Sequence, residues 1–158
     1  MIGTVSKVLN IINNKNFDDD NLVKSTYMRV AELKHVRPVL GETLYDDIDT
    51  NASGTGYSTL KSLYLDDVIA YYTVYESLPF IQLQITDKGL MVNTSETSNQ
   101  ATSEQRAELR NSILSQANVL RDRMMEYIKD NVTTYTLYDS GENQNLTTTV
   151  IGGIILDT

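Results

Sequence analysis

The chain has 158 residues, of which 41% are hydrophobic, so it is long enough for one apolar core and too short to need two. It carries 21 acidic and 13 basic residues without a basic cluster, which argues against a protein whose task is to bind DNA or RNA, since such binding needs several cations on one face. It has no cysteine for disulfides or thiolate metal sites, and no apolar run as long as a signal sequence or a membrane span, so we expect a soluble protein that is not exported.

Residues 1–17 are predicted to be an N-terminal arm in which Thr4 or Ser6 caps a single helical turn. Three aspartates, Asp18–Asp20, then precede a first helix. The apolar face of this helix has the spacing of three and four residues that is typical of an amphipathic helix, and consists of Leu22, Val23, Tyr27, Val30 and Ala31. The aspartates stand where a helix N-terminus favours negative charge, and we prefer this interpretation to a metal site.

The stretch HVRPVLGETLYDDI, residues 35–48, separates two helical patterns. Pro38 is predicted to stop or kink the first helix, because its ring opposes a helical predecessor and it donates no hydrogen bond. Gly41 permits a turn, and a short second helix from Glu42 is expected to present Leu44, Tyr45 and Ile48. The composition of residues 51–56, NASGTG, then predicts a flexible loop.

A long helix is predicted from Ser58, with Pro79 ending or kinking it. Its stripe is Leu60, Tyr64, Val68, Tyr71, Tyr75 and Leu78, widened by Leu63 and Tyr72. Residues 80–85 fit a continued helix or an alternating strand, and periodicity does not decide between them. We expect a turn at 87–89, which includes Gly89, and a short strand at 90–92, so that a hairpin follows the central helix.

A last long helix is predicted to begin at Thr102, with Gln105 completing a capping box, and to end near Asn131. Its apolar seam is Leu109, Ile113, Ala117, Leu120, Met124, Tyr127 and Ile128. The expected fold is therefore mainly α: a small bundle of three to four helices, two of them long, with a short β-hairpin after the central helix. Residues 1–131 would form this helical domain.

Residues 132–158 are predicted to be a β-prone tail, with strands at 133–138 and 146–156 around a turn at 140–145. Such a hairpin exposes strand edges that tend to recruit another chain, or it folds back on its own helices, and the residues leave both alternatives open. For contacts with another chain the candidates in the tail are Tyr138, Val150, Ile151, Ile154 and Ile155.

No constellation in the sequence predicts catalysis, a cofactor or a metal. Residues 46–58 resemble a calcium loop, but Ala52 stands where the sharp turn needs glycine and Ser58 where a bidentate glutamate should close the shell. His35 and Arg37 lack the third orienting group and the nucleophile that catalysis requires, so we interpret them as local scaffolding or as contacts between subunits. Tyr45 is a further candidate for such a contact.

Three stretches carry a resemblance to a known family: AELKHVRPVLGETLYDDI at 31–48, LDDVIAYYTVYESLPFIQLQITDKGLMV at 65–92, and the helix at 103–131. Their order resembles that of the head-tail connector (adaptor or neck ring) proteins of tailed bacteriophages, especially those of crAss-like phages. In such proteins a helix ends at a step of the pattern P-x-L-G-x-x-L-Y, a tyrosine- and alanine-containing helix follows, and a turn with a lysine–glycine pair leads to a final long helix. Pro38 and Gly41 would then set the angle between the first two helices.

The resemblance implies a homo-oligomeric ring, commonly of twelve copies, that lies between the portal protein and adjacent neck or tail rings. DNA would pass through its lumen without specific binding. The protein would be assembled in the host cytoplasm and reside in the virion, with no membrane, no cofactor and no enzymatic activity. The alternative from a different class is a small soluble non-enzymatic module for protein binding or regulation.

Overall fold

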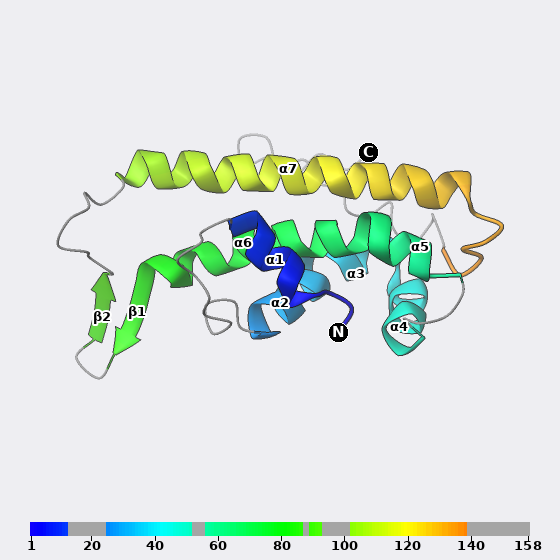
Figure 1. Cartoon of the computed structure of the whole chain (residues 1–158), viewed down its shortest axis with the longest axis horizontal. Helices are drawn as coiled ribbons and strands as arrows, with labels where there is room; N and C mark the ends of the chain where they lie inside the picture. Colours follow the sequence, from blue (N-terminus) through cyan, green and yellow to red (C-terminus); the bar gives the residue numbers. More distant parts are fainter. Residues whose placement is uncertain (13–24, 52–55, 87–88, 93–101, 139–158) are drawn as a thin grey trace, which may run out of the picture.

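The computed structural model describes residues 1–12, 25–51, 56–86, 89–92 and 102–138, and this part of the chain is mainly helical, as expected. The chain order, drawn in Figure 1, is α1 (Val5–Ile12), α2 (Ser25–Ala31), η1 (Glu32–Val36), α3 (Arg37–Leu40), α4 (Glu42–Thr50), α5 (Ser58–Leu60), η2 (Lys61–Leu65), α6 (Asp66–Gln82), β1 (Leu83–Thr86), β2 (Gly89–Val92) and α7 (Ser103–Asp130). The elements η1 and η2 are π-helical turns within otherwise α-helical runs.

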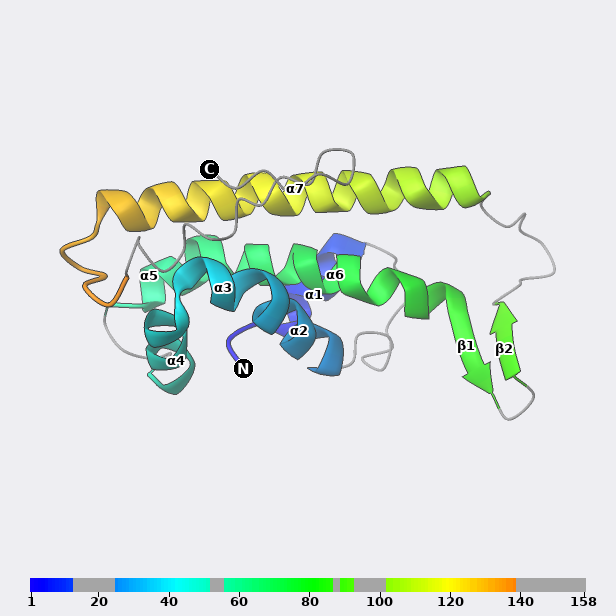
Figure 2. The same ribbon diagram turned by 180° about the vertical axis from the view of Figure 1, so that it is seen from behind.

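Helix α6 is the centre of the bundle. Figures 1 and 2 show α7 running antiparallel along one side of it, while α1 and α2 pack on the other side. Its sequence is apolar nearly all round, which is typical of a helix buried on several faces rather than on one stripe. The buried residues of this helix are Asp66, Val68, Ile69, Ala70, Tyr72, Thr73, Val74 and Ser77.

The predicted long helix from Ser58 is present, but its single-stripe description was wrong in one respect. Leu63, assigned to the apolar stripe, is 62% exposed, because the π turn at 61–65 changes the direction in which side chains leave the helix. Pro79 does not end the helix, which continues to Gln82 before β1 begins, so residues 80–85 are helix first and strand afterwards.

The N-terminal segment is an integral part of the core, so its prediction as an arm with a single helical turn was wrong. It forms the eight-residue helix α1, and Ile2 and Val8 are 1% and 0% exposed. The backbone at Gly3 approaches its neighbours so closely that a Cβ there would lie 2.6 Å from Ile69 Cγ2 and 2.8 Å from Met28 Sδ. Glycine is needed at this position because no side chain fits.

Pro38 does not stop the first helix either. The helix passes through the π turn η1 and the proline and ends at Leu40. A π turn adds one residue per turn, which relieves the conflict between the proline ring and the carbonyl one turn earlier. Gly41 then makes the corner, as predicted, with φ 82° and ψ 150°, a conformation that is essentially restricted to glycine.

Helices α4 and α7 follow the sequence closely. In α4, Leu44, Tyr45 and Ile48 are buried, and α7 begins with the predicted capping box between Thr102 and Gln105. Of the predicted α7 seam, Ile113, Ala117, Met124 and Ile128 are buried and Leu120 and Tyr127 half-buried. Leu109 was assigned wrongly, since it is 50% exposed.

The two strands pair antiparallel with the register Leu83↔Val92 to Thr86↔Gly89, and the hairpin projects beyond the end of α6 in Figures 1 and 2. Gly89 is the first residue of β2, and the two residues before it lie outside the described part of the chain.

A strand at 133–138 was predicted wrongly, because this stretch is a series of turns. Amides of residues 134 and 135 donate to the carbonyl of Asn131, and the amide of Tyr138 donates to the carbonyl of Tyr135. The turns bring Tyr135 and Tyr138, 2% and 9% exposed, back onto the helices. Residues 132–138 therefore belong to the helical body, and the rest of the predicted β-prone tail, 139–158, lies outside the described residues.

Candidate functional site

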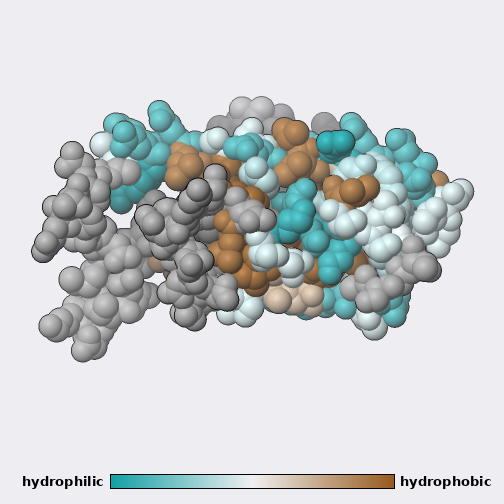
Figure 3. Space-filling model, in the orientation of Figure 1, coloured by the Kyte–Doolittle hydropathy of each residue, from teal (hydrophilic) through white to brown (hydrophobic). Residues whose placement is uncertain are grey.

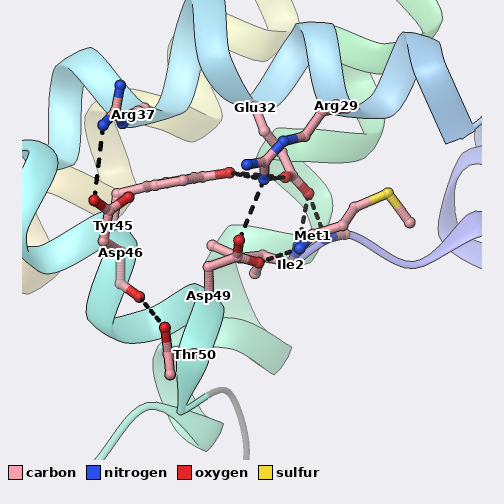
Figure 4. A network of polar contacts seen from close by, with 10 residues as sticks. Met1, Ile2, Arg29, Glu32, Arg37, Tyr45, Asp46, Asp49 and Thr50 are labelled. Carbon is pink, nitrogen blue, oxygen red and sulfur yellow. Dashed lines mark hydrogen bonds and ion pairs between the residues drawn. The ribbon is translucent and has the colours of Figure 1, made fainter.

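The carboxylate of Glu32 is the centre of a buried polar network (Figure 4). Glu32 is 0% exposed, and its Oε1 accepts hydrogen bonds from the backbone amides of Ile2 and Gly3, both at 2.8 Å. Its Oε2 accepts one from the Tyr45 hydroxyl at 2.9 Å and faces Arg29 Nη1 at 3.4 Å. The network thus ties the N-terminal segment, the first helix and α4 together.

Arg29 extends this network to the surface. Its Nη1 donates to the Tyr45 hydroxyl at 2.8 Å and to Asp49 Oδ2 at 3.3 Å, and Asp49 also accepts from the Met1 backbone nitrogen. Burial, and then the hydrogen bond to Glu32, raise the pKa of Tyr45, so this hydroxyl keeps its proton and remains a donor.

The chemistry open to Glu32 follows from its partners. A carboxylate offers about four acceptor positions. Here they face two backbone amides, a hydroxyl and a guanidinium, all from this chain. No acceptor position is left for a substrate or a metal ion, so Glu32 holds elements together.

A second cluster surrounds His35, on η1. Its Nε2 lies 2.8 Å from Glu76 Oε1, and its ring stacks on Tyr72 with centroids 4.2 Å apart and planes 3° from parallel. Lys34 Nζ also pairs with Glu76, at 3.0 Å. The Tyr72 hydroxyl continues the contact to α7 by donating to Asn118 Oδ1 at 2.8 Å.

Glu76 titrates below an ordinary glutamate as a result. Burial raises its pKa, but the hydrogen bonds from His35 and Lys34, together with the electrostatic attraction of these side chains, outweigh burial, so the pKa lies below 4.5. The histidine thus joins η1 to α6, which agrees with the predicted scaffolding role; its predicted contact between subunits stays a prediction.

Arg37 crosses the corner at Gly41. Its Nη2 pairs with Glu42 and lies 3.7 Å from Asp46 Oδ2, so it fastens α3 to the first turns of α4. Its Nε is buried without a hydrogen-bond partner in the described part of the chain.

Tyrosines gather at the end of the bundle where α7 terminates. Tyr64 stacks on Tyr127 at 4.6 Å, and Tyr135 lies between Tyr127 and Tyr57, at 6.0 and 6.3 Å between centroids. The Tyr57 hydroxyl donates to the Asp47 carboxylate, and burial, followed by this bond, raises the pKa of Tyr57 to about 12. The cluster anchors residues 131–138 on the bundle.

The structure therefore gives four of the eight predicted contact residues, His35, Arg37, Tyr45 and Tyr138, contacts within the chain. Tyr45 is 1% exposed and Tyr138 9% exposed, so neither is available to a partner without unfolding. Val150, Ile151, Ile154 and Ile155 lie outside the described residues. Of the predicted turn residues, only Gly41 forms a corner between two helices. Pro38 and Pro79 lie within helices, and Gly89 is the first residue of β2.

Sequence analysis missed Glu32, Glu76 and Gly3. A signal existed for Glu32: it lies four residues after Met28 and next to Ala31, on the buried face of the first helix, where a charge requires a partner. Nothing comparable marks Gly3, whose role depends on residues of two other helices.

Exposed apolar side chains lie at both ends of the elongated body and also elsewhere on it, where Met1, Leu33 and Val119 are 53%, 41% and 65% exposed. At the hairpin end these are Phe80 and Leu109, 53% and 50% exposed. At the opposite end they are Leu63, Val132 and Leu137, 62%, 51% and 40% exposed. On the face drawn in Figure 3, the apolar side chains shown in colour form separate groups divided by polar ones.

Within the described ranges, no three His, Cys, Asp or Glu side chains are grouped so that they could hold a metal ion. Among the helices described, none combines the length and the apolar character needed to cross a lipid bilayer.

Comparison with known proteins gives one match. The model of a family of unknown function (DUF6712) matches residues 36–148, which is more than two thirds of the chain and includes the Gly41 corner, α6, the hairpin and α7. No curated protein and no solved structure matches the chain.

Proposed function

Because the chain belongs to the family of unknown function DUF6712, we propose its role from its own residues: it is a structural head-tail connector (adaptor or neck ring) subunit of a tailed bacteriophage. Copies of it assemble into a ring, of twelve in the commonest arrangement, between the portal protein and the next neck or tail ring. DNA passes through the lumen of this ring on its way to the tail.

The observation that carries the proposal is that the two ends of the elongated body expose different apolar residues, in addition to Met1, Leu33 and Val119 elsewhere on it. Phe80, late in α6, and Leu109, early in α7, lie at one end, and Leu63 in η2 with Val132 and Leu137 after α7 lie at the other. Two different apolar ends suit a contact in which the hairpin end of one copy meets the opposite end of the next copy. Such a contact closes into a ring when the rotation between neighbouring copies divides a full turn into equal steps.

The polar residues favour a structural role over an enzymatic one. Among the acids of the described residues Glu32 has the most hydrogen-bond partners, and Glu32 and Glu76 both join separate elements of the fold. His35, the chain's one histidine, is stacked on Tyr72 and its Nε2 pairs with Glu76, so these contacts join η1 to α6. We therefore propose that the protein has no catalytic activity.

The order of elements and the charge also support the connector role. The three stretches that resemble connectors, 31–48, 65–92 and 103–131, correspond in order to the Gly41 corner, to α6 with the hairpin, and to α7. Twelve copies of a chain with charge −8 carry about −96, and an acidic lumen repels the phosphate backbone, so that moving DNA does not adhere.

Sedimentation of the full chain, alone and mixed with portal protein, tests the proposal. We expect ring-sized complexes with portal even if the chain alone is monomeric, because docking raises the local concentration of copies. A chain that stays monomeric and ignores portal in the mixture would contradict the connector role and would favour the alternative, a small protein-binding or regulatory module.

A further inference from the structure

The β1–β2 hairpin is a small sheet with little support. Among the described elements its main neighbour is the end of α6, from which it projects (Figures 1 and 2). A two-stranded hairpin is marginally stable by itself in water, and each of its outer edges carries unpaired amides and carbonyls. A third strand would satisfy one of these edges.

The register identifies the free amides of β2. Because only two residues connect Thr86 to Gly89, the backbones of Thr86 and Gly89 form a hydrogen-bonded pair. Hydrogen-bonded and non-hydrogen-bonded pairs then alternate along the two strands. The amides of Gly89 and Met91 therefore point to β1. Those of Leu90 and Val92 point to the outer edge, which is the side of the hairpin away from the bundle in both ribbon views.

A segment suited to such an edge lies near the C-terminus. Residues 146–156, LTTTVIGGIIL, carry no charge, and seven of the eleven are β-branched, which favours a strand. This composition, with hydrogen bonds supplied by the backbone, is typical of a segment that pairs with an exposed strand edge.

The segment starts too far from the hairpin of its own chain. Tyr135 stacks on Tyr57, just before the helical run from Ser58 to Gln82, whereas the hairpin follows the other end of this run. At about 1.5 Å per residue the run is about 37 Å long. The eight residues from Tyr138 to Leu146 span at most about 29 Å, so Leu146 cannot reach its own hairpin, and Val150 reaches it only with the chain nearly fully extended. Only the last residues of the segment can reach it, so the whole strand 146–156 cannot pair within its own chain.

We propose that the outer edge of β2 in one copy receives residues 146–156 of the neighbouring copy as a third strand. This inference rests on the proposed ring, and it deepens it by naming the two surfaces that meet. The donor leaves one end of the body and the acceptor lies at the other, so the contact is head to tail and propagates around the ring.

Two full-length variants test the proposal. Leu90→Pro removes an outward amide of β2 without removing an amide that pairs with β1, so it blocks the acceptor. Val150→Pro combined with Ile154→Pro blocks the donor. For each variant alone, the affinity of copies for one another in the presence of portal should fall at least tenfold. A mixture of the two variants should form a pair with one copy of each, because the first variant keeps an intact C-terminal segment and the second keeps an intact β2 edge. Leu90→Ala, which keeps the amide, is the matched control and should assemble like the wild type.

The outcomes separate the two proposals. A wild-type chain that assembles while both variants also assemble overturns the strand exchange and leaves the ring intact. A wild-type chain that never assembles, alone or with portal, overturns both.

Amide hydrogen exchange of the wild type tests the same proposal without depending on whether the variants fold. On assembly, exchange at Leu90 and Val92 should slow by roughly tenfold or more, whereas Gly89 and Met91, already paired to β1, should change less. Equal exchange at Leu90 and Val92 before and after assembly would overturn the proposal.

Discussion

Single residues fix the path of this chain at three places where the backbone comes under tight constraint. Gly3 fits where a side chain would meet Ile69 and Met28, Gly41 takes a conformation reserved for glycine, and Glu32 captures the amides of residues 2 and 3 inside the core. Each acts by excluding an alternative path, so each should be sensitive to a small substitution.

Replacing Gly41 by valine should lower the free energy of unfolding by about 1–3 kcal/mol, because a β-branched residue is strained at φ 82°. Urea denaturation measures this. Gly56→Ala is the matched control, since a Cβ at Gly56 meets nothing within 4 Å. Equal stability of Gly41→Val and the wild type would mean that the corner relaxes to another conformation.

Replacing Glu32 by glutamine should lower the free energy of unfolding by about 1–3 kcal/mol. The new amide group faces hydrogen-bond donors and leaves at least one of them buried without an acceptor. Glu108→Gln, on the exposed side of α7, should be nearly neutral. Chemical denaturation of the two variants checks the contrast, and a neutral Glu32→Gln would show that the network contributes little to stability.

The lowered pKa of Glu76 predicts an acid-dependent contribution to stability. The folded pKa lies below the unfolded value near 4.5, so the ionised group stabilises the fold above that pH, and this contribution disappears as the pH falls through the folded pKa. The stability gap between wild type and Glu76→Gln should therefore be widest near neutral pH and narrow below 4.5.

Asp66 provides the control of opposite sign, because burial raises its pKa. Its ionisation opposes folding, so the stability of the wild type relative to Asp66→Asn should decrease as the pH rises through the folded pKa. Denaturation curves at a series of pH values measure both trends, and parallel trends in the two variants would contradict the assignment.

At the scale of elements, the parts of the fold with local causes could be predicted from the sequence. The capping box of α7, the short helix α4 and the Gly41 corner depend on residues close in the chain, and all three are present. The seam of α7 from Ile113 to Ile128 follows from periodicity for the same reason.

The parts with distant causes could not be predicted. The docking of α1 depends on Glu32 and on the space beside Ile69, and the path of residues 132–138 depends on aromatic partners more than fifty residues away in sequence. The π turns η1 and η2 change the helical register without a distinctive motif, which is why Leu63 was assigned to the wrong face and Pro38 was expected to end a helix that continues. For the candidate site, His35 and Arg37 were recognised as unusual, but their partners Glu76, Glu42 and Asp46 lie on other elements.

Truncation distinguishes the helical body from the segment that follows it. A chain ending at Tyr138 should keep the thermal midpoint of the full chain. For a chain ending at Asn131 the free energy of unfolding should fall by about 3–5 kcal/mol and the midpoint should fall with it, because the buried ring of Tyr135 beside Tyr57 and Tyr127 is removed. Thermal unfolding followed by circular dichroism compares the two. Equal midpoints would show that the turns at 132–138 are dispensable.

At the scale of the whole molecule, the body is a long antiparallel packing of α6 and α7 with different apolar residues at its two ends and an unsupported hairpin at one of them. We propose that a second copy, placed end to end, covers these apolar residues and extends the hairpin. A cryo-EM map of the portal protein mixed with the full chain tests this most directly. The account predicts a closed ring of copies around an open channel, each touching the next through its hairpin end; single copies on the portal, or pairs related by a two-fold axis, would contradict it.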